Sequence, residues 1–199
     1  MDRGITRLLS VTAIDGLDVG TDDARAEAVG AAIVALAVPL GGDSAFDAAL
    51  TKVWDVTRPE TGRSARTADG AWVAGLQADQ LWFLRPDTTA GHDVDDVPDA
   101  VAHAAYLTDQ SDAWVAVRIE GPRVREALAR LCMLDLTDSP FPVGAVTRTL
   151  MEHMGVVILR EDDANGHARF LLLAPRSYAG SFVHAVETAI TNAASRHES

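Results

Sequence analysis

The clearest pattern in the chain is an alternation of side-chain types over residues 113–120. Its two faces are Val115, Val117 and Ile119 on one side and Trp114, Ala116 and Arg118 on the other. A period of two predicts a β-strand. Pro122 then suits the first turn of a helix, and apolar residues recur at three- and four-residue intervals from Val124 to Cys132. This spacing predicts a helix that ends near Asp135.

Three strands and a second helix are predicted after the loop at residues 138–144. The strand segments are 146–151, 155–161 and 170–173. The first two of these are expected to pair as a hairpin. An apolar face recurs from Phe182 to Ile190, which predicts a last helix capped by Ser177. The second half is thus predicted as strand, helix, three strands and helix.

The first half offers the same order of elements. Its predicted strands are 33–38, 63–67, 72–76 and 81–84, with a helix capped by Ser44 after the first strand and a closing helix over 97–107. A shift of 82 residues places segment 62–67 on segment 144–149. Short apolar strands resemble one another by chance, but the shared order across both halves favours a duplication.

These elements predict an α+β fold of two tandem βαβββα modules. A chain of 199 residues with 48% apolar side chains is long enough to bury a sizeable core. Residues 1–30 are expected to form an acidic N-terminal extension. Residues 31–112 are expected to form the first module with its linker, and residues 113–199 the second module.

The charge balance excludes several classes of partner. The chain has 29 acidic and 17 basic residues and a formal net charge of −12, so its field repels nucleic acids and anionic membranes. The longest apolar run, residues 29–40, is too short to span a bilayer. The first residues also lack the apolar segment of a signal peptide. We expect a cytoplasmic protein that binds neither nucleic acid nor membrane.

No set of residues with catalytic, cofactor-binding or metal-binding chemistry is predicted. The sequence contains neither a phosphate-binding glycine loop nor the nucleophile elbow of serine hydrolases. Cys132 lies on an apolar stripe, which favours a buried side chain over a nucleophile. The residues that could suggest a metal site are His92, Asp93, Asp95, Asp96, Asp99 and His103. Because their spacing matches no fixed ligand pattern, a solvated acidic loop is the favoured interpretation.

Arginine and tryptophan side chains are the stronger candidates for contacts with another molecule. The arginines on or beside predicted strands are Arg63, Arg66, Arg148 and Arg176. Their planar forks suit carboxylates or phosphates, and pairing with the chain's own acids is the favoured alternative for each one. The tryptophans expected in a core between sheet and helix are Trp54, Trp72 and Trp114. Trp82 is expected to face outward, where it would anchor a partner.

Several segments occur in a recognisable order along the chain. In the second half they are Val117-Arg118-Ile119-Glu120-Gly121-Pro122, Leu131-Cys132-Met133-Leu134-Asp135-Leu136, Phe141-Pro142-Val143-Gly144 with Arg148-Thr149, and Pro175-Arg176-Ser177-Tyr178-Ala179. A weaker set in the first half is Ala71-Trp72-Val73-Ala74-Gly75-Leu76 and Ala78-Asp79-Gln80-Leu81-Trp82. In this order the segments resemble the gamma subunit of heterotetrameric sarcosine oxidase. The usual glycine-proline-aspartate turn of that family reads Gln77-Ala78-Asp79 here.

The resemblance implies a fold of ferredoxin-like modules, similar to the folate-binding domain of the glycine-cleavage T-protein. It also implies a non-catalytic subunit of a complex that oxidatively demethylates sarcosine or a related N-methyl amino acid. In that family the alpha subunit handles NAD and folate, the beta subunit carries FAD and FMN, and the delta subunit binds zinc, whereas the gamma subunit holds no cofactor. The residues expected at an interface are Arg63, Trp82, Arg148, Arg176 and Tyr178.

A free-standing folate-binding or aminomethyltransferase-like protein is the alternative. A chain of 199 residues lacks room for the extra domain of the full transferase. The cysteine-containing motif of the related iron–sulfur assembly factors is also missing from the sequence. Both observations favour the subunit interpretation.

Overall fold

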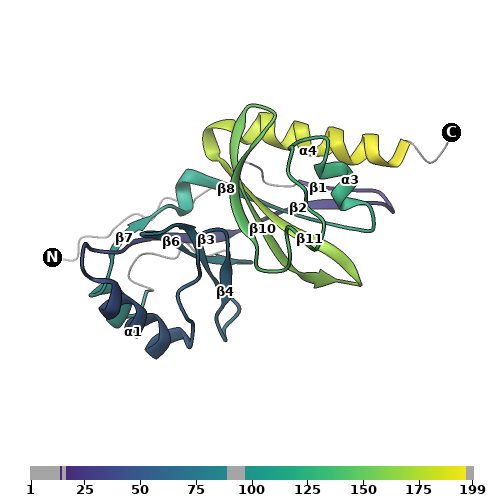
Figure 1. The fold of residues 1–199 in the computed structure, drawn as a ribbon. Coiled ribbons are helices and arrows are strands. Elements are labelled where there is room, and N and C mark those ends of the chain that lie inside the picture. Colours follow the sequence, from purple (N-terminus) through teal and green to yellow (C-terminus); the bar gives the residue numbers. More distant parts are fainter. Residues whose placement is uncertain (1–13, 15–16, 89–96, 196–199) are drawn as a thin grey trace.

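The computed structural model describes residue 14, residues 17–88 and residues 97–195, and these form two antiparallel sheets with helices on their outer faces (Figure 1). The strands are β1 (Asp18–Gly20), β2 (Arg25–Val29), β3 (Ala31–Ala37), β4 (Ser64–Arg66), β5 (Trp72–Gln77), β6 (Gln80–Pro86), β7 (Tyr106–Asp109), β8 (Trp114–Glu120), β9 (Val146–Met151), β10 (Met154–Ala164) and β11 (His167–Pro175). The helices are α1 (Asp43–Trp54), α2 (Asp99–Ala102), α3 (Val124–Leu128) and α4 (Ala179–Ala194), with short 3-10 turns η2 (Ser111–Ala113) and η3 (Arg176–Tyr178). The six-stranded sheet has the order β1-β2-β8-β11-β10-β9, and the five-stranded sheet has the order β4-β5-β6-β3-β7.

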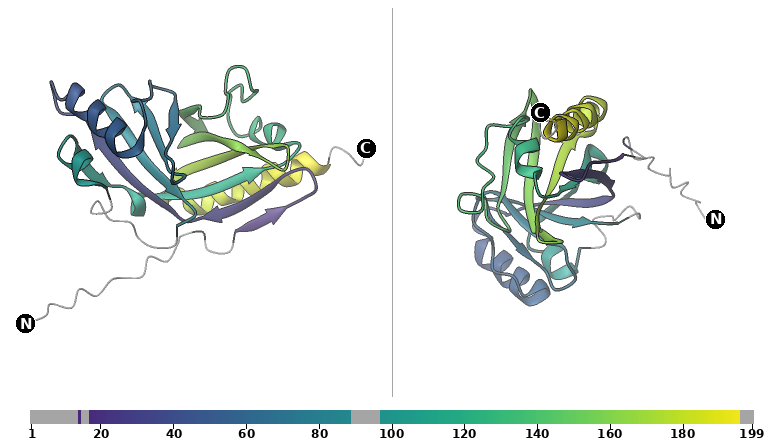
Figure 2. Two further views of the ribbon diagram at one scale, coloured as in Figure 1. Left: turned by 90° about the horizontal axis from the view of Figure 1, so that it is seen from below. Right: turned by 90° about the vertical axis from the view of Figure 1, so that its right-hand side faces the viewer.

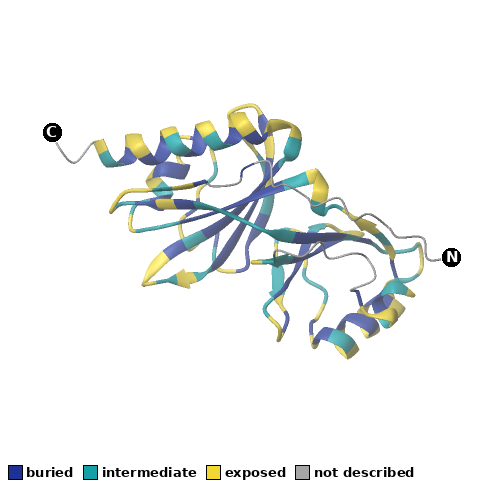
Figure 3. Ribbon diagram, turned by 180° about the vertical axis from the view of Figure 1, so that it is seen from behind, coloured by how far each residue is buried: buried dark blue, intermediate teal, exposed yellow. Residues whose placement is uncertain are grey.

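The two sheets pack against each other, and each is covered on its outer face by helices (Figures 1 and 2). Helices α3 and α4 cover the six-stranded sheet, and α1 with α2 covers the five-stranded sheet. The buried side of α4 faces its sheet (Figure 3). The central layer of the core is formed by Ile33, Trp72, Ala74, Trp82, Leu84, Ala116, Val146, Val157, Leu159, Leu171 and Leu173. The protein is therefore built as helix, sheet, sheet and helix.

Alternation along the strands explains this layering. In β8, Val115 packs under the helices while Ala116 packs between the sheets, which confirms the predicted period of two. In β11 both faces are buried, because Phe170 packs under the helices and Leu171 packs between the sheets. A strand that is covered on both faces needs an almost continuous apolar run, as β11 has.

Both modules have the predicted order of strand, helix, three strands and helix. The strand order β4-β5-β6-β3 in one sheet corresponds to β9-β10-β11-β8 in the other. The six-stranded sheet is extended by β1 and β2, and the five-stranded sheet is extended by β7. Strand β2 precedes β3 in the chain but pairs with β8, and β7 precedes β8 but pairs with β3. Strands β1 and β2, which precede the first module in the chain, therefore belong to the sheet of the second module, and this ties one sheet to the other (Figure 2).

Equivalent segments of the two modules meet where β4 and β9 begin. The backbone amide of Ser64 donates to the carbonyl oxygen of Gly144 at 2.7 Å, and the amide of Val146 donates to the carbonyl oxygen of Gly62 at 3.1 Å. Gly62 corresponds to Gly144, and Ser64 to Val146, under the 82-residue shift predicted from the sequence. The two hydrogen bonds are thus reciprocal, as expected for duplicated halves related by a local two-fold axis.

The expected extension over residues 1–30 lies partly outside the described residues, but its residues 17–30 are not a separate segment. Strand β2 is hydrogen-bonded to β8 along Arg25–Val29, so this segment is an integral part of the six-stranded sheet. Gly121 directly follows β8 and packs closely against the turn that precedes β2. A Cβ atom at this position would lie only 2.6 Å from the carbonyl oxygen of Asp23, so a larger residue would not fit. The acidic composition concealed a strand whose small side chains, such as Ala26, are buried.

Two predicted helices are shorter than expected. The segment 97–107 contains only the four-residue helix α2, followed by strand β7. The helix that was expected to end near Asp135 ends at Leu128, although Cys132 still packs into the same core. In both segments the apolar spacing correctly predicted which residues are buried. It did not predict the helix length, because turns can bury the same side chains as a continuous helix.

The two predicted capping serines do not cap their helices. Helix α1 has Gly42 at its N-cap, so Ser44 lies inside the first turn. Helix α4 has Tyr178 at its N-cap, and Ser177 lies in the preceding 3-10 turn. Neither N-cap makes a side-chain hydrogen bond.

A cluster of charged side chains joins the two sheets beside the central core. The guanidinium of Arg118 donates to both carboxylate oxygens of Asp87 at 2.6 and 2.8 Å, and its Nε donates to Glu161 at 2.8 Å. Asp87 follows the five-stranded sheet, whereas Arg118 and Glu161 belong to the six-stranded sheet. Burial opposes the charge of Arg118, but its hydrogen bonds with Asp87 and Glu161 outweigh burial and raise its pKa.

The pH dependence of stability should report the Asp87–Arg118 contact. The hydrogen bond from Arg118 lowers the pKa of Asp87 in the folded protein, whereas an unfolded aspartate titrates at about pH 3.9. The stabilisation is therefore complete above that pH and is lost as the pH falls through the lower, folded pKa. We expect Asp87→Asn to be less stable than wild type at neutral pH and to approach wild type in acid, as measured by urea unfolding. A difference that stays constant across the titration would contradict this assignment.

Candidate functional site

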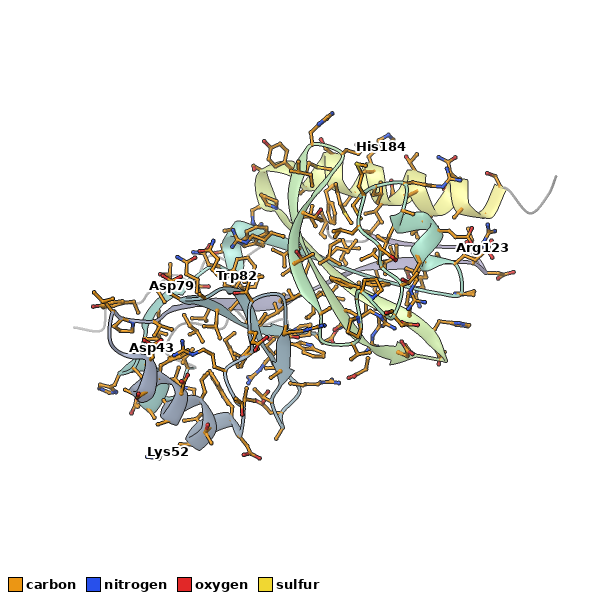
Figure 4. The ribbon with its side chains drawn as sticks, viewed as in Figure 1. Asp43, Lys52, Asp79, Trp82, Arg123 and His184 are labelled. Carbon is orange, nitrogen blue, oxygen red and sulfur yellow. The ribbon has the colours of Figure 1, made fainter. Side chains whose placement is uncertain are left out.

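A groove of about 340 Å³ opens between the two sheets, at the end of the interface where β3 finishes and β6 and β7 begin. Its walls include Ala37, Gln80, Trp82, Tyr106, Trp114 and Arg148. Trp82 lies at the junction of the sheets (Figure 4). The groove therefore combines residues from both modules, and it forms only when the sheets have packed together.

Arg148 reaches the groove because of its position on β9. Val146 is buried between the sheets, and alternation places Arg148 and Leu150 on the same face farther along the strand. The Cζ atom of Arg148 lies 5.1 Å from the ring centroid of Trp82 and 6.0 Å from that of Trp114. A guanidinium at these distances is attracted to the faces of aromatic rings.

The two tryptophans form one aromatic wall of the groove. Their ring centroids lie 5.0 Å apart with an interplanar angle of 69°, which is an edge-to-face arrangement. Trp82 is only 5% exposed, while Trp114 is half-buried and Tyr106 is 71% exposed. The base of the groove is therefore buried at Trp82, and its rim is exposed to solvent at Tyr106.

The charge of Arg148 is not balanced within the described part of the chain. Among those residues, no carboxylate oxygen lies within 4.0 Å of its guanidinium. Other arginines behave differently, since Arg58 pairs with Asp43 and Asp47. With its side chain exposed, Arg148 offers several N–H donors to a carboxylate or phosphate from another molecule.

The predicted interface residues meet only in part. Trp82 and Arg148 come together in the groove, but Trp82 is buried rather than outward-facing, because the second sheet covers its strand. Arg63 is exposed at the junction of the sheets, where its backbone pairs with Ala145. The Nε of Arg176 donates to the carbonyl oxygen of Asp112 at 2.7 Å. Tyr178 is 50% exposed.

The predicted core tryptophans are buried to different extents. Trp54 packs between α1 and its sheet and stacks on Phe83, as expected. Trp72 packs between the two sheets rather than between sheet and helix, and Trp114 lines the groove. The sequence pattern located these strands without revealing that a second sheet would cover them.

Sequence reasoning missed the contribution of β7. Tyr106 and Thr108 of β7 line the groove together with the following Gln110, whereas the sequence predicted a helix over 97–107 and no element for Thr108 and Gln110. Tyr106 and Thr108 alternate with Leu107, and this short period of two was the available signal. Four residues were too few to outweigh the apolar spacing of the preceding segment.

Cys132, Asp99 and His103 do not line the groove. Cys132 is 6% exposed and packs into the core under the helices, as its place on the apolar stripe predicted, and burial raises the pKa of its thiol. Of the metal-like set, His92, Asp93, Asp95 and Asp96 lie outside the described residues. His103 instead contacts the carbonyl oxygen of Asp99 through Nδ1 at 2.6 Å. Within the described ranges, no group of three or more potential metal ligands is present.

None of the helices in the described ranges has the length and apolar character needed to cross a membrane.

No family model and no curated protein matches the sequence. Among solved structures, heterotetrameric sarcosine oxidase from Corynebacterium sp. U-96, in complex with pyrrole 2-carboxylate, matches with a TM-score of 0.71 and 21% identity over 90% of both chains. An aspartate kinase from Clostridium acetobutylicum matches with a TM-score of 0.32 and 9% identity over 85% of this chain and 34% of that chain, and it carries no argument. Over nine-tenths of its length, this chain therefore has the fold of a chain of heterotetrameric sarcosine oxidase.

Proposed function

We propose that the chain is the non-catalytic gamma-like subunit of a complex that oxidatively demethylates sarcosine or a related N-methyl amino acid. The observation that carries this proposal is the fold match over 90% of both chains. The ordered segments that resemble the gamma subunit support the same assignment independently of the fold. The proposal places the protein in the cytoplasm.

The groove suits a binding role better than a catalytic one. Its tryptophans and Arg148 can stack and donate hydrogen bonds, but no activated nucleophile or acid–base pair accompanies them in the described lining. In this proposal the alpha, beta and delta partners carry NAD, folate, FAD, FMN and zinc. The gamma-like chain contributes a rigid surface on which these partners assemble.

Co-purification tests the proposal. A tagged form of this chain should be expressed with the genes that neighbour it, and separately on its own. We expect a stable complex that absorbs light as a flavoprotein and oxidises an N-methyl amino acid, whereas the isolated chain should do neither. Recovery of a monomer without any flavin-carrying partner would contradict the proposal. Tight binding of tetrahydrofolate by the isolated chain, measured by calorimetry, would favour the free-standing alternative.

A further inference from the structure

The two modules carry an equivalent arginine, and the structure treats the two copies differently. Arg66 on β4 corresponds to Arg148 on β9 under the 82-residue shift. Each follows the junction of the sheets by the same number of residues. Each also stacks on tryptophan, since the Cζ of Arg66 lies 5.3 Å from the ring centroid of Trp72. Both arginines therefore lie against tryptophan, although Trp72 is the strand partner of Arg66 in the same sheet, whereas Trp82 reaches Arg148 from the other sheet.

The difference between the copies is the counter-ion. Arg66 forms a hydrogen-bonded ion pair with Asp162, which belongs to the other sheet. Arg148 has no such carboxylate among the described residues. One site is thus completed within the chain, whereas its equivalent has no counter-ion in the described ranges of a protein whose formal net charge is −12.

We infer that the Arg148 groove is the docking site for an acidic side chain of a partner subunit, whose carboxylate takes the role that Asp162 has at Arg66. This inference rests on the proposed function, which supplies the partner. The carboxylate would receive charge-assisted hydrogen bonds from Arg148, while neighbouring partner atoms pack on Trp82 and Trp114.

The shape of the groove favours a protein partner over a small carboxylate. A small-molecule site encloses most of its ligand's surface, but here Arg148 is exposed and Tyr106 is 71% exposed at the rim. Leu150 continues the face of Arg148 and is 63% exposed. A partner that covers the cation would also bury these apolar side chains, and an interface gains affinity from such burial.

Zero-length crosslinking tests the inference directly. Lys52 is the only lysine of the chain, so Arg148→Lys adds a single new amine. In the assembled complex, a carbodiimide activates a carboxylate, and the amine displaces the resulting urea to form an amide. We expect mass spectrometry to find this amide between position 148 and an aspartate or glutamate of a partner subunit. The matched variant Arg66→Lys should crosslink to Asp162 within the chain.

Assembly measurements provide the quantitative test. Arg148→Glu should weaken the complex by about tenfold or more, because it places two negative charges together, and the loss should shrink at high salt. Arg148→Lys should retain most of the affinity. The control Arg66→Gln removes an internal ion pair and should leave assembly unchanged. Equal affinities for wild type and Arg148→Glu would overturn the inference.

A partner-free measurement separates this inference from the proposed function. If no complex assembles, the proposed function fails, and the groove is probed with a tetraglutamate peptide and a tetraglutamine control. We expect only tetraglutamate to shift the indole N–H signals of Trp82 and Trp114 in NMR spectra, and Arg148→Gln to abolish the shifts. Absence of these shifts would overturn the docking site, as would a crosslink from position 148 to Asp93, Asp95 or Asp96 of the same chain.

Discussion

Replacing Arg118 with methionine is expected to lower the free energy of unfolding by about 3 to 5 kcal/mol, the range for breaking a buried ion pair. The side chain of Glu161 is only 4% exposed, and Arg118 Nε donates to it at 2.8 Å. Without Arg118, this carboxylate keeps a weaker contact with Arg169 Nε at 3.4 Å. A buried charge with too few partners destabilises the folded protein, and urea unfolding measures the loss.

Two further variants identify the cause of that loss. In the double variant Arg118→Met with Glu161→Leu, the most deeply buried carboxylate is removed together with its main partner, so much of the stability should return, while Arg169 loses only a 3.4 Å contact. Arg25→Met is the surface control, because Arg25 pairs with Asp18 while 52% of its side chain is exposed. Such a pair contributes at most about 1 kcal/mol. If Arg118→Met and Arg25→Met cost the same, the cluster does not stabilise the contact between the sheets.

Truncation of Leu128 is expected to cost about 2 to 5 kcal/mol, because Leu128→Ala removes buried apolar surface and leaves a cavity. Leu128 is fully buried at the end of α3, in the core that α3 and α4 form against the six-stranded sheet. The measurement is again urea unfolding, with an unchanged slope against denaturant showing that the folded state is preserved.

Met133→Ala is the matched control for this core. Met133 follows Leu128 by five residues and is fully exposed, so its truncation should change the free energy of unfolding by less than about 0.5 kcal/mol. A similarly small effect for Leu128→Ala would show that the short helix α3 contributes little to the core.

The counter-ion of each arginine illustrates what a sequence can and cannot predict about a site. Arg66 and Arg148 stood out because both lie on strands, and internal pairing was the favoured alternative for each. That alternative is confirmed for Arg66, which pairs with Asp162, and it fails for Arg148 in the described part of the chain. The two positions have similar local sequences, so the difference arises from which residues of the other sheet face them.

The sequence by itself predicted the βαβββα order within each half and the duplication, because alternation and apolar stripes depend only on residues that are close together in the chain. The 82-residue shift even aligned Gly62 with Gly144, the glycines that meet at the junction of the sheets. Only the tertiary structure decided that β2 pairs with β8 and β7 with β3, and that Trp82, Trp114 and Arg148 meet. Strand pairing over such distances depends on how whole faces pack, and no short-range period encodes it.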